Sequence, residues 1–167
     1  MHEPRFETER LRAALRYWTS KCADGRLPSR RDFDPPTEVP RLLPHIVLVD
    51  VAHDPLDFRY RLVGTEVCSR VDADYTGVRL TDLPHQRPGS RVWENATLVV
   101  EQRRPVFSDI PYVGADPDVR GYQDLLMPLS RDGCRVDMIF ALIEFDIAAF
   151  DGAAFDFTAR GEAGITP

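Results

Sequence analysis

The side chains that most often carry chemistry are few and widely spaced in this sequence. The histidines are His2, His45, His53 and His85, and the cysteines are Cys22, Cys68 and Cys134. No CxxC pair occurs, so neither a zinc site nor a disulfide framework is indicated. A haem iron needs an axial His or Cys, and only His85, in "DLPHQRPGS", lies near a region expected to form a pocket. A lone histidine beside two prolines is more typical of an exposed loop, so we predict no haem.

Carboxylates and nucleophiles form no recognised site either. The segments "DADY" (72–75) and "GADPD" (114–118) lack the spacing and terminal Glu of a calcium loop, and we predict that both are turns. Ser108 and Ser130 have no histidine at a recognisable spacing, and no GxSxG, HExxH or P-loop pattern is present. Triads are assembled in space, so a catalytic site is not excluded, but the sequence favours a protein that is not an enzyme.

A small-molecule pocket is the remaining candidate site, because such pockets are mostly apolar with a few placed polar groups. Either Arg61 or Arg79 could fix a carboxylate or phosphate, since a guanidinium offers a planar fork of donors. Two alternatives stay open: the aromatic residues could be plain core, and Arg61 could pair with Asp50, Asp124 or Glu144. The candidate pocket residues are Tyr60, Arg61, Leu62, Tyr75, Arg79, Trp93, Phe107, Tyr122, Met138 and Phe140. The sequence does not say which face of the sheet lines the pocket.

The composition limits the classes of partner. The net charge of -6 gives no basic field that would attract nucleic acid or anionic lipid. No apolar run approaches the ~20 residues of a membrane span, and the N-terminus lacks an apolar signal core. We therefore expect no nucleic-acid binding, no membrane insertion and a cytoplasmic location.

The sequence divides into an N-terminal helix (1–27), a central domain (28–147) and a C-terminal tail (148–167). The pattern predicts an amphipathic helix over 6–24, with Leu11, Leu15 and Trp18 on one stripe. This stripe could cover the domain's own sheet or contact a second copy, and the two roles are compatible.

The central domain alternates strands with short helices. Two strands, 45–53 and 58–64, are followed by a short helix over 65–71 and a longer helix that Ser90 begins and Pro105 ends. Strands at 105–113, 120–130 and 134–146 complete it. This order predicts an α+β fold, a five-stranded antiparallel sheet with short helices on one face. The last strand is apolar on both faces, so both must be covered, one by the short helices and one by the N-terminal helix.

One segment runs from the second strand through the short helix to the next turn: "RYRLVGTEVCSRVDADYTG" (59–77). Strand alternation predicts that Tyr60 and Leu62 share one face while Arg61 and Val63 share the other. The strand ends at Gly64, and the helix from Thr65, an expected N-cap, is too short to be stable alone. We predict that this helix forms the lid of a pocket, stabilised by packing.

The element order, together with "LPSRRDFDP", "LPHIVLVDV", "FRYRLVGTEV", "YTGVRLTDL", "LLMPLSRDG" and "VDMIFALIEFD", resembles a PAS domain, of a bacterial, mainly alphaproteobacterial, stand-alone PAS family. The resemblance covers roughly residues 15–147. It implies a five-stranded antiparallel sheet whose helices enclose a pocket, and signalling by a change of shape. Light-sensing PAS proteins carry a cysteine in an Asn-Cys-Arg-Phe type of motif, whereas Cys68 lies in "TEVCSRV", so we predict no flavin.

The resemblance implies a sensory or interaction module that binds a small ligand or a protein partner. We expect a homodimer or an unknown signalling partner to carry the output, and we predict no cofactor, although an unknown small molecule is compatible with the pattern. The alternative is an enzyme or carrier on a cone-shaped α+β fold, in which a long helix precedes all the strands. The discriminating feature is the order of elements along the chain.

Overall fold

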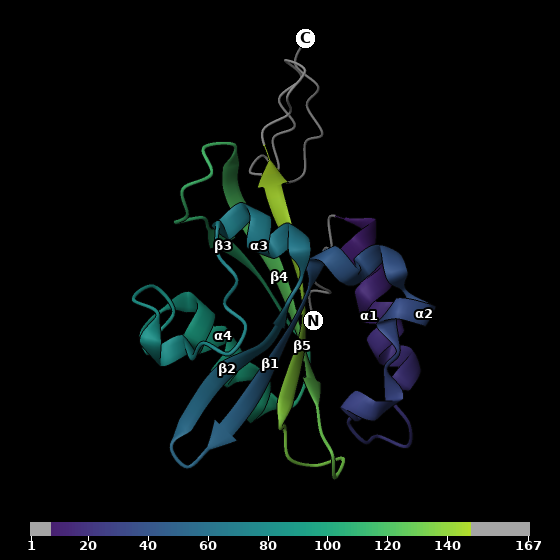
Figure 1. The fold of residues 1–167 in the computed structure, drawn as a ribbon. Coiled ribbons are helices and arrows are strands. Elements are labelled where there is room, and N and C mark those ends of the chain that lie inside the picture. Colours follow the sequence, from purple (N-terminus) through teal and green to yellow (C-terminus); the bar gives the residue numbers. More distant parts are fainter. Residues whose placement is uncertain (1–7, 148–167) are drawn as a thin grey trace.

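A computed structural model describes residues 8–147 of the chain (Figure 1). One five-stranded antiparallel sheet forms its centre, with the strand order β2-β1-β5-β4-β3. The strands are β1 (Ile46–His53), β2 (Leu56–Val63), β3 (Val106–Pro111), β4 (Val119–Leu129) and β5 (Met138–Ile147). The predicted fold class and the predicted order of two strands before the helices and three after them are confirmed.

The central strand β5 is buried on both faces. Met138, Phe140 and Leu142 pack in the core beneath the N-terminal helix, whereas Ile139 and Ala141 pack in the core beneath the short helices. A strand with apolar side chains on both faces requires a layer on each side. Both layers are present, as the sequence predicted (Figure 1).

The first layer is α1 (Glu9–Lys21), which begins where the Thr8 hydroxyl accepts a hydrogen bond from the Leu11 amide. Leu11 is fully buried, and the Trp18 indole donates to the Pro128 carbonyl at 2.9 Å. α1 therefore covers this face of the sheet. Its outer face is charged, because Glu9 pairs with Arg16 there.

A proline-rich strap connects α1 to β1 on the same face of the sheet. Its elements are η1 (Arg30–Asp32), α2 (Pro35–Glu38) and η2 (Pro40–His45). Phe33 in the strap packs against Phe140 of β5, with 5.4 Å between the ring centroids. The strap thus belongs to the domain core.

The second layer consists of α3 (Thr65–Val71), η3 (Leu80–Asp82) and α4 (Arg91–Gln102). The Ser90 hydroxyl caps α4 by accepting from the Trp93 amide at 3.1 Å, as predicted. The predicted N-cap of α3 is wrong by one residue: Gly64 is the N-cap, and Thr65 is the first helical residue.

A β-bulge at Arg61 changes which side chains of β2 face the helices. Leu48 pairs with Leu62 and Val49 pairs with Tyr60, so Arg61 is the extra residue. Beyond it the alternation is reversed: Leu62 is 44% exposed, and Val63 packs in the core beneath the helices. The predicted facing of Leu62 and Val63 is therefore wrong, because strict alternation holds only for an unbulged strand.

The C-terminal tail predicted at 148–167 lies outside the described residues. Within residues 8–147, no helix combines the length and apolar character needed to cross a membrane.

Candidate functional site

A cavity of 190 Å³ lies between the sheet and α3. The sheet forms its floor, α3 forms one wall, and the loops after η3 and after β3 close its sides. Its lining is mainly apolar and consists of Val47, Tyr60, Val63, Val67, Val71, Tyr75, Leu83, Pro84, His85, Gln86, Tyr112, Val113, Gly114, Tyr122, Ile143 and Phe145. The predicted place of α3 as a wall of an enclosure agrees with this geometry.

The structure brings together Tyr60, Tyr75 and Tyr122 of the predicted pocket residues. The rings of Tyr60 and Tyr75 are stacked, with 5.9 Å between their centroids. The Tyr60 hydroxyl donates to the Gln86 side-chain oxygen at 2.5 Å, which ties β2 to the loop after η3. These tyrosines give the cavity an aromatic surface, and the Tyr60 hydroxyl adds a polar group to it.

Four other predicted aromatic or apolar candidates lie outside the cavity. Met138 and Phe140 are buried beneath α1, on the opposite face of the sheet, and Phe107 packs against the same core. Trp93 packs edge-on against Phe58, with 5.0 Å between the ring centroids. It lies on the cavity side of the sheet but is not among the lining residues. Placing all of these residues in one pocket with Tyr60 was therefore wrong, because the strand faces could not be assigned from sequence.

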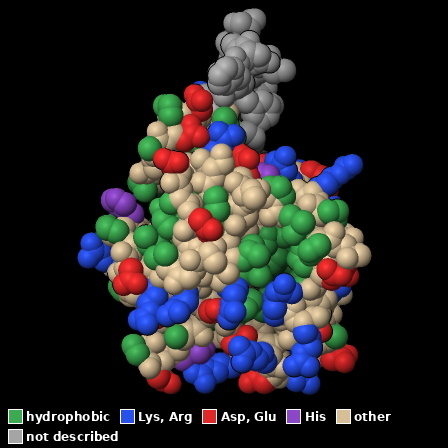
Figure 2. Space-filling view, viewed as in Figure 1, with side chains coloured by type: hydrophobic (Ala, Val, Ile, Leu, Met, Phe, Trp, Pro, Cys, Tyr) green, Lys and Arg blue, Asp and Glu red, His purple; other side chains and the backbone are tan. Residues whose placement is uncertain are grey.

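The two predicted anion-binding arginines also lie outside the cavity. The Arg61 Nε donates to an Asp50 carboxylate oxygen at 2.8 Å, and its side chain is 59% exposed. This is one of the ion pairs left open as an alternative for Arg61. Arg79 lines a separate surface groove with Arg59 and Asp57. Figure 2 shows Lys and Arg side chains gathered in a band across the lower part of the molecular surface in that view.

A smaller inner chamber of 60 Å³ adjoins the cavity and contains a buried carboxyl group. The two spaces share the lining residues Val47, Tyr60, Tyr122 and Ile143. Asp124 of β4 lines the inner chamber and is only 3% exposed.

Asp124 is held by a chain of neutral donors. The Asn95 amide of α4 donates to the Ser108 hydroxyl at 2.6 Å, and that hydroxyl donates to Asp124. Burial raises the pKa of Asp124 to about 6, although the hydrogen bonds from Ser108 and Asn95 oppose the shift; the nearby Asp109 charge adds to it. From the sequence, Asp124 was expected only as a possible partner for Arg61. The usable signal was a carboxylate within the otherwise apolar end of β4.

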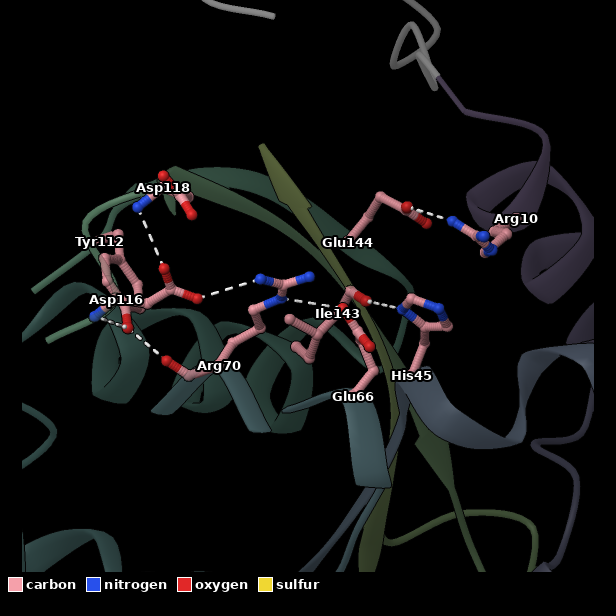
Figure 3. Close-up of polar contacts among 9 residues, drawn as sticks. All are labelled: Arg10, His45, Glu66, Arg70, Tyr112, Asp116, Asp118, Ile143 and Glu144. Atoms are coloured by element: carbon pink, nitrogen blue, oxygen red, sulfur yellow. Dashed lines mark hydrogen bonds and ion pairs between the residues drawn. The ribbon is translucent and has the colours of Figure 1, made fainter. Parts of the chain in front are cut away.

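A polar clasp made by Arg70, Glu66, Asp116 and Tyr112 fastens α3 to the loop between β3 and β4 (Figure 3). The Arg70 guanidinium donates to Glu66 at 2.9 Å and to Asp116 at 3.0 Å. The Tyr112 hydroxyl donates to the Arg70 carbonyl and accepts from the Asp116 amide. The clasp joins two of the walls of the cavity. Sequence reasoning missed it, although Glu66 and Arg70 have the i,i+4 spacing of a helical ion pair.

An Arg70→Met variant should loosen the wall of the cavity with little loss of global stability. The methionine retains most of the aliphatic packing but breaks both ion pairs of the clasp, and partly exposed pairs contribute roughly 1 kcal/mol or less. We expect amide hydrogen exchange in residues 112–118 to become about five-fold faster.

Arg61→Met is the matched control, because it breaks the ion pair with Asp50 outside the cavity. Hydrogen exchange by mass spectrometry measures both variants. Equal exchange in residues 112–118 of the R70M and R61M variants would show that the clasp does not hold the loop.

The remaining residues considered for cofactors have ordinary surroundings. His85 is exposed at the mouth of the cavity. The Cys68 thiol donates to the Val63 carbonyl at 3.6 Å, and burial raises its pKa. Among residues 8–147, no group of three or more His, Cys, Asp and Glu side chains could hold a metal ion.

The fold defines a small α+β domain with a ligand-sized cavity between its antiparallel sheet and α3. The family model described as "PAS domain" matches residues 6–143, so the chain belongs to the PAS domain family. A solved structure with a similar fold is the PAS domain of the histidine kinase ThkA, at 18% identity; the match covers 60% of this chain and 98% of that chain, with a TM-score of 0.43. No curated protein matches the sequence.

The cone-shaped alternative does not fit this chain. In that fold one long helix precedes the strands and plugs a cone. Here α1 has only 13 residues, and α3, η3 and α4 divide the strands into two before them and three after them.

Proposed function

We propose that this PAS domain is a non-catalytic sensory module that takes a small, mainly apolar molecule into the cavity beneath α3. The observation that carries the proposal is the cavity itself: apolar side chains and four tyrosines line 190 Å³ of space. An apolar cavity of ~150 Å³ can hold benzene. The volume therefore suits a ligand of about one ring.

The α3 wall of the cavity and the clasp that holds it could transmit the binding of a ligand to the rest of the domain. A bound molecule would touch Val67 and Val71 of α3 and Tyr112 of the loop between β3 and β4. Those elements are connected through Arg70. A ligand that binds one arrangement of the clasp better than another shifts the population of the two.

The output would pass to a protein partner or to a second copy of the chain, in a reducing cytoplasm that suits its three free cysteines. Leu11 and Trp18 are buried against the domain's own sheet, so a partner can meet α1 only on its outer face. Leu15 is partly buried at the margin of the same core. Light scattering measures the mass of the protein in solution and so tests whether two copies of the chain associate.

Filling the cavity should abolish ligand uptake. In a Val71→Phe variant the added ring occupies space at the α3 wall, so a molecule that co-purifies with the wild-type protein should be absent. Native mass spectrometry of protein purified from its own source measures the retained mass.

Leu98→Phe is the control, because Leu98 is 37% exposed on α4 and does not line the cavity. The L98F variant should retain the molecule. Equal retention by the V71F and L98F variants would place the ligand elsewhere, and a wild-type protein that takes up no small molecule would overturn the proposal.

A further inference from the structure

The charges around the cavity do not suit the carboxylate or phosphate that Arg61 or Arg79 could have bound. No Lys or Arg side chain lines either chamber among the described residues, and Arg61 and Arg79 lie outside both. The ionisable acid of the inner chamber is Asp124. A carboxylate or phosphate ligand would bring a second negative charge to a mainly apolar space whose lining includes no Lys or Arg to pair with it.

Asp124 has the surroundings of a carboxylate that lacks a cation. Its described partners, Ser108 and Asn95, are neutral donors from β3 and α4. The charged group that affects the pKa of Asp124 is Asp109, also an acid, and the titratable Tyr60 and Tyr122 line the same chamber. An ionised group buried in this way is costly unless a positive charge pairs with it.

The shape of the two chambers suits a ring followed by a small polar head. The outer cavity has 190 Å³ and an aromatic wall where Tyr60 stacks on Tyr75. The inner chamber has 60 Å³, which suits a head group about the size of an ammonium or a water molecule. Tyr60 and Tyr122 line both spaces, so a cationic head in the inner chamber would lie near two aromatic rings, and aromatic rings attract cations.

We propose that the cavity binds an apolar amine of about one-ring size, with its ring in the outer cavity and its ammonium group on Asp124. This inference rests on the proposed function, because it names the class of ligand that the same cavity takes. The ammonium would donate to Asp124 in a site with little water, and the tyrosines would contact the ring. The acid thereby gains the positive partner that the protein itself does not provide.

Three single-ring probes separate charge from shape: benzylamine, benzyl alcohol and benzoate. Their dissociation constants are measured by NMR titration of the full chain. We expect benzylamine to bind most tightly and benzoate not at all. An Asp124→Asn variant should weaken benzylamine roughly 10- to 100-fold, the cost of losing one hydrogen-bonded charged partner, and leave benzyl alcohol nearly unchanged.

Asp109→Asn is the matched control, because it removes a neighbouring negative charge on β3 that does not line either chamber. The D109N variant should retain the preference for benzylamine.

A second measurement needs no Asp124 variant. Lowering the pH from about 7.5 to about 5 protonates Asp124, so it should weaken the binding of benzylamine but not that of benzyl alcohol. A His85→Gln variant should show the same pH dependence, which assigns it to Asp124 instead of the histidine at the mouth.

The outcomes distinguish this inference from the proposed function. Benzyl alcohol or benzoate binding as tightly as benzylamine, or unchanged benzylamine binding by the D124N variant, would overturn the amine assignment while the cavity remains a ligand site. Failure of all three probes to bind the wild-type protein would overturn both.

Discussion

A Gly64→Ala variant should lose about 3 kcal/mol of unfolding free energy, a large effect for one methyl group. A Cβ atom at this position would lie 2.3 Å from the Pro44 carbonyl oxygen and 2.7 Å from the Leu43 carbonyl oxygen. Both are backbone atoms of η2, which cannot turn away as a flexible side chain can. The Gly64 amide also donates to the Ile46 carbonyl at 2.8 Å, so retreat would break a hydrogen bond.

Urea denaturation measures this loss, and Gly89→Ala is its control. Gly89 has open space where a methyl group would lie but a φ of +94°, so alanine there costs only about 1 to 2 kcal/mol of backbone strain. Similar losses in the two variants would show that close packing at Gly64 is not the reason for the glycine. The G64A variant should also bind cavity probes more weakly, because Gly64 sets the position where α3 begins.

This close approach sharpens what the sequence could say about the start of α3. The glycine after "RYRLV" predicted correctly that the strand stops and a short helix follows. It could not reveal that the backbone of η2, about twenty residues earlier in the chain, packs closely against Gly64. Contacts between distant segments depend on strand order, which no local pattern in the chain specifies.

The limits of the pocket prediction have the same origin. The apolar pattern of β5 correctly predicted a layer on each face of the sheet. For β2, one extra residue at Arg61 reversed the facing of Leu62 and Val63. For β3, nothing in the sequence showed that Ser108 faces Asp124 while Phe107 faces α1. Side-chain direction follows register, so the candidate site could be predicted only where alternation was regular.

An Asp124→Asn variant should be more stable than the wild-type protein at neutral pH, by about 1 to 3 kcal/mol. Burial raises the pKa of Asp124 to about 6 in the folded state, whereas an aspartate in the unfolded chain has a pKa near ~3.9. Between these values the folded state binds the proton more tightly, so unfolding free energy falls as the pH rises from about 4 to about 6. The cost of the ionised carboxylate is fully present above about pH 6, and each unit of pKa difference corresponds to ~1.4 kcal/mol.

The pH dependence separates this cost from packing. At about pH 4 the wild-type carboxyl group is protonated in the folded state, so the D124N variant should have no advantage; at about pH 7.5 the full advantage should be present. Urea denaturation at both values measures the difference, and Asp82→Asn shows the effect of removing one exposed carboxylate. A D124N variant that is less stable by the same amount at both values would mean that hydrogen bonds from Ser108 and Asn95 outweigh the burial of the charge.

The stability and the binding of the D124N variant should change in opposite directions. Asparagine removes the buried charge that weakens the fold, and the same change removes the group that pairs with an ammonium ion. A bound amine would offset that cost in the wild-type protein, so benzylamine should raise its unfolding temperature at about pH 7.5 and leave that of the D124N variant unchanged. A buried carboxylate that weakens the empty domain is explained physically if the cation that stabilises it arrives with the ligand.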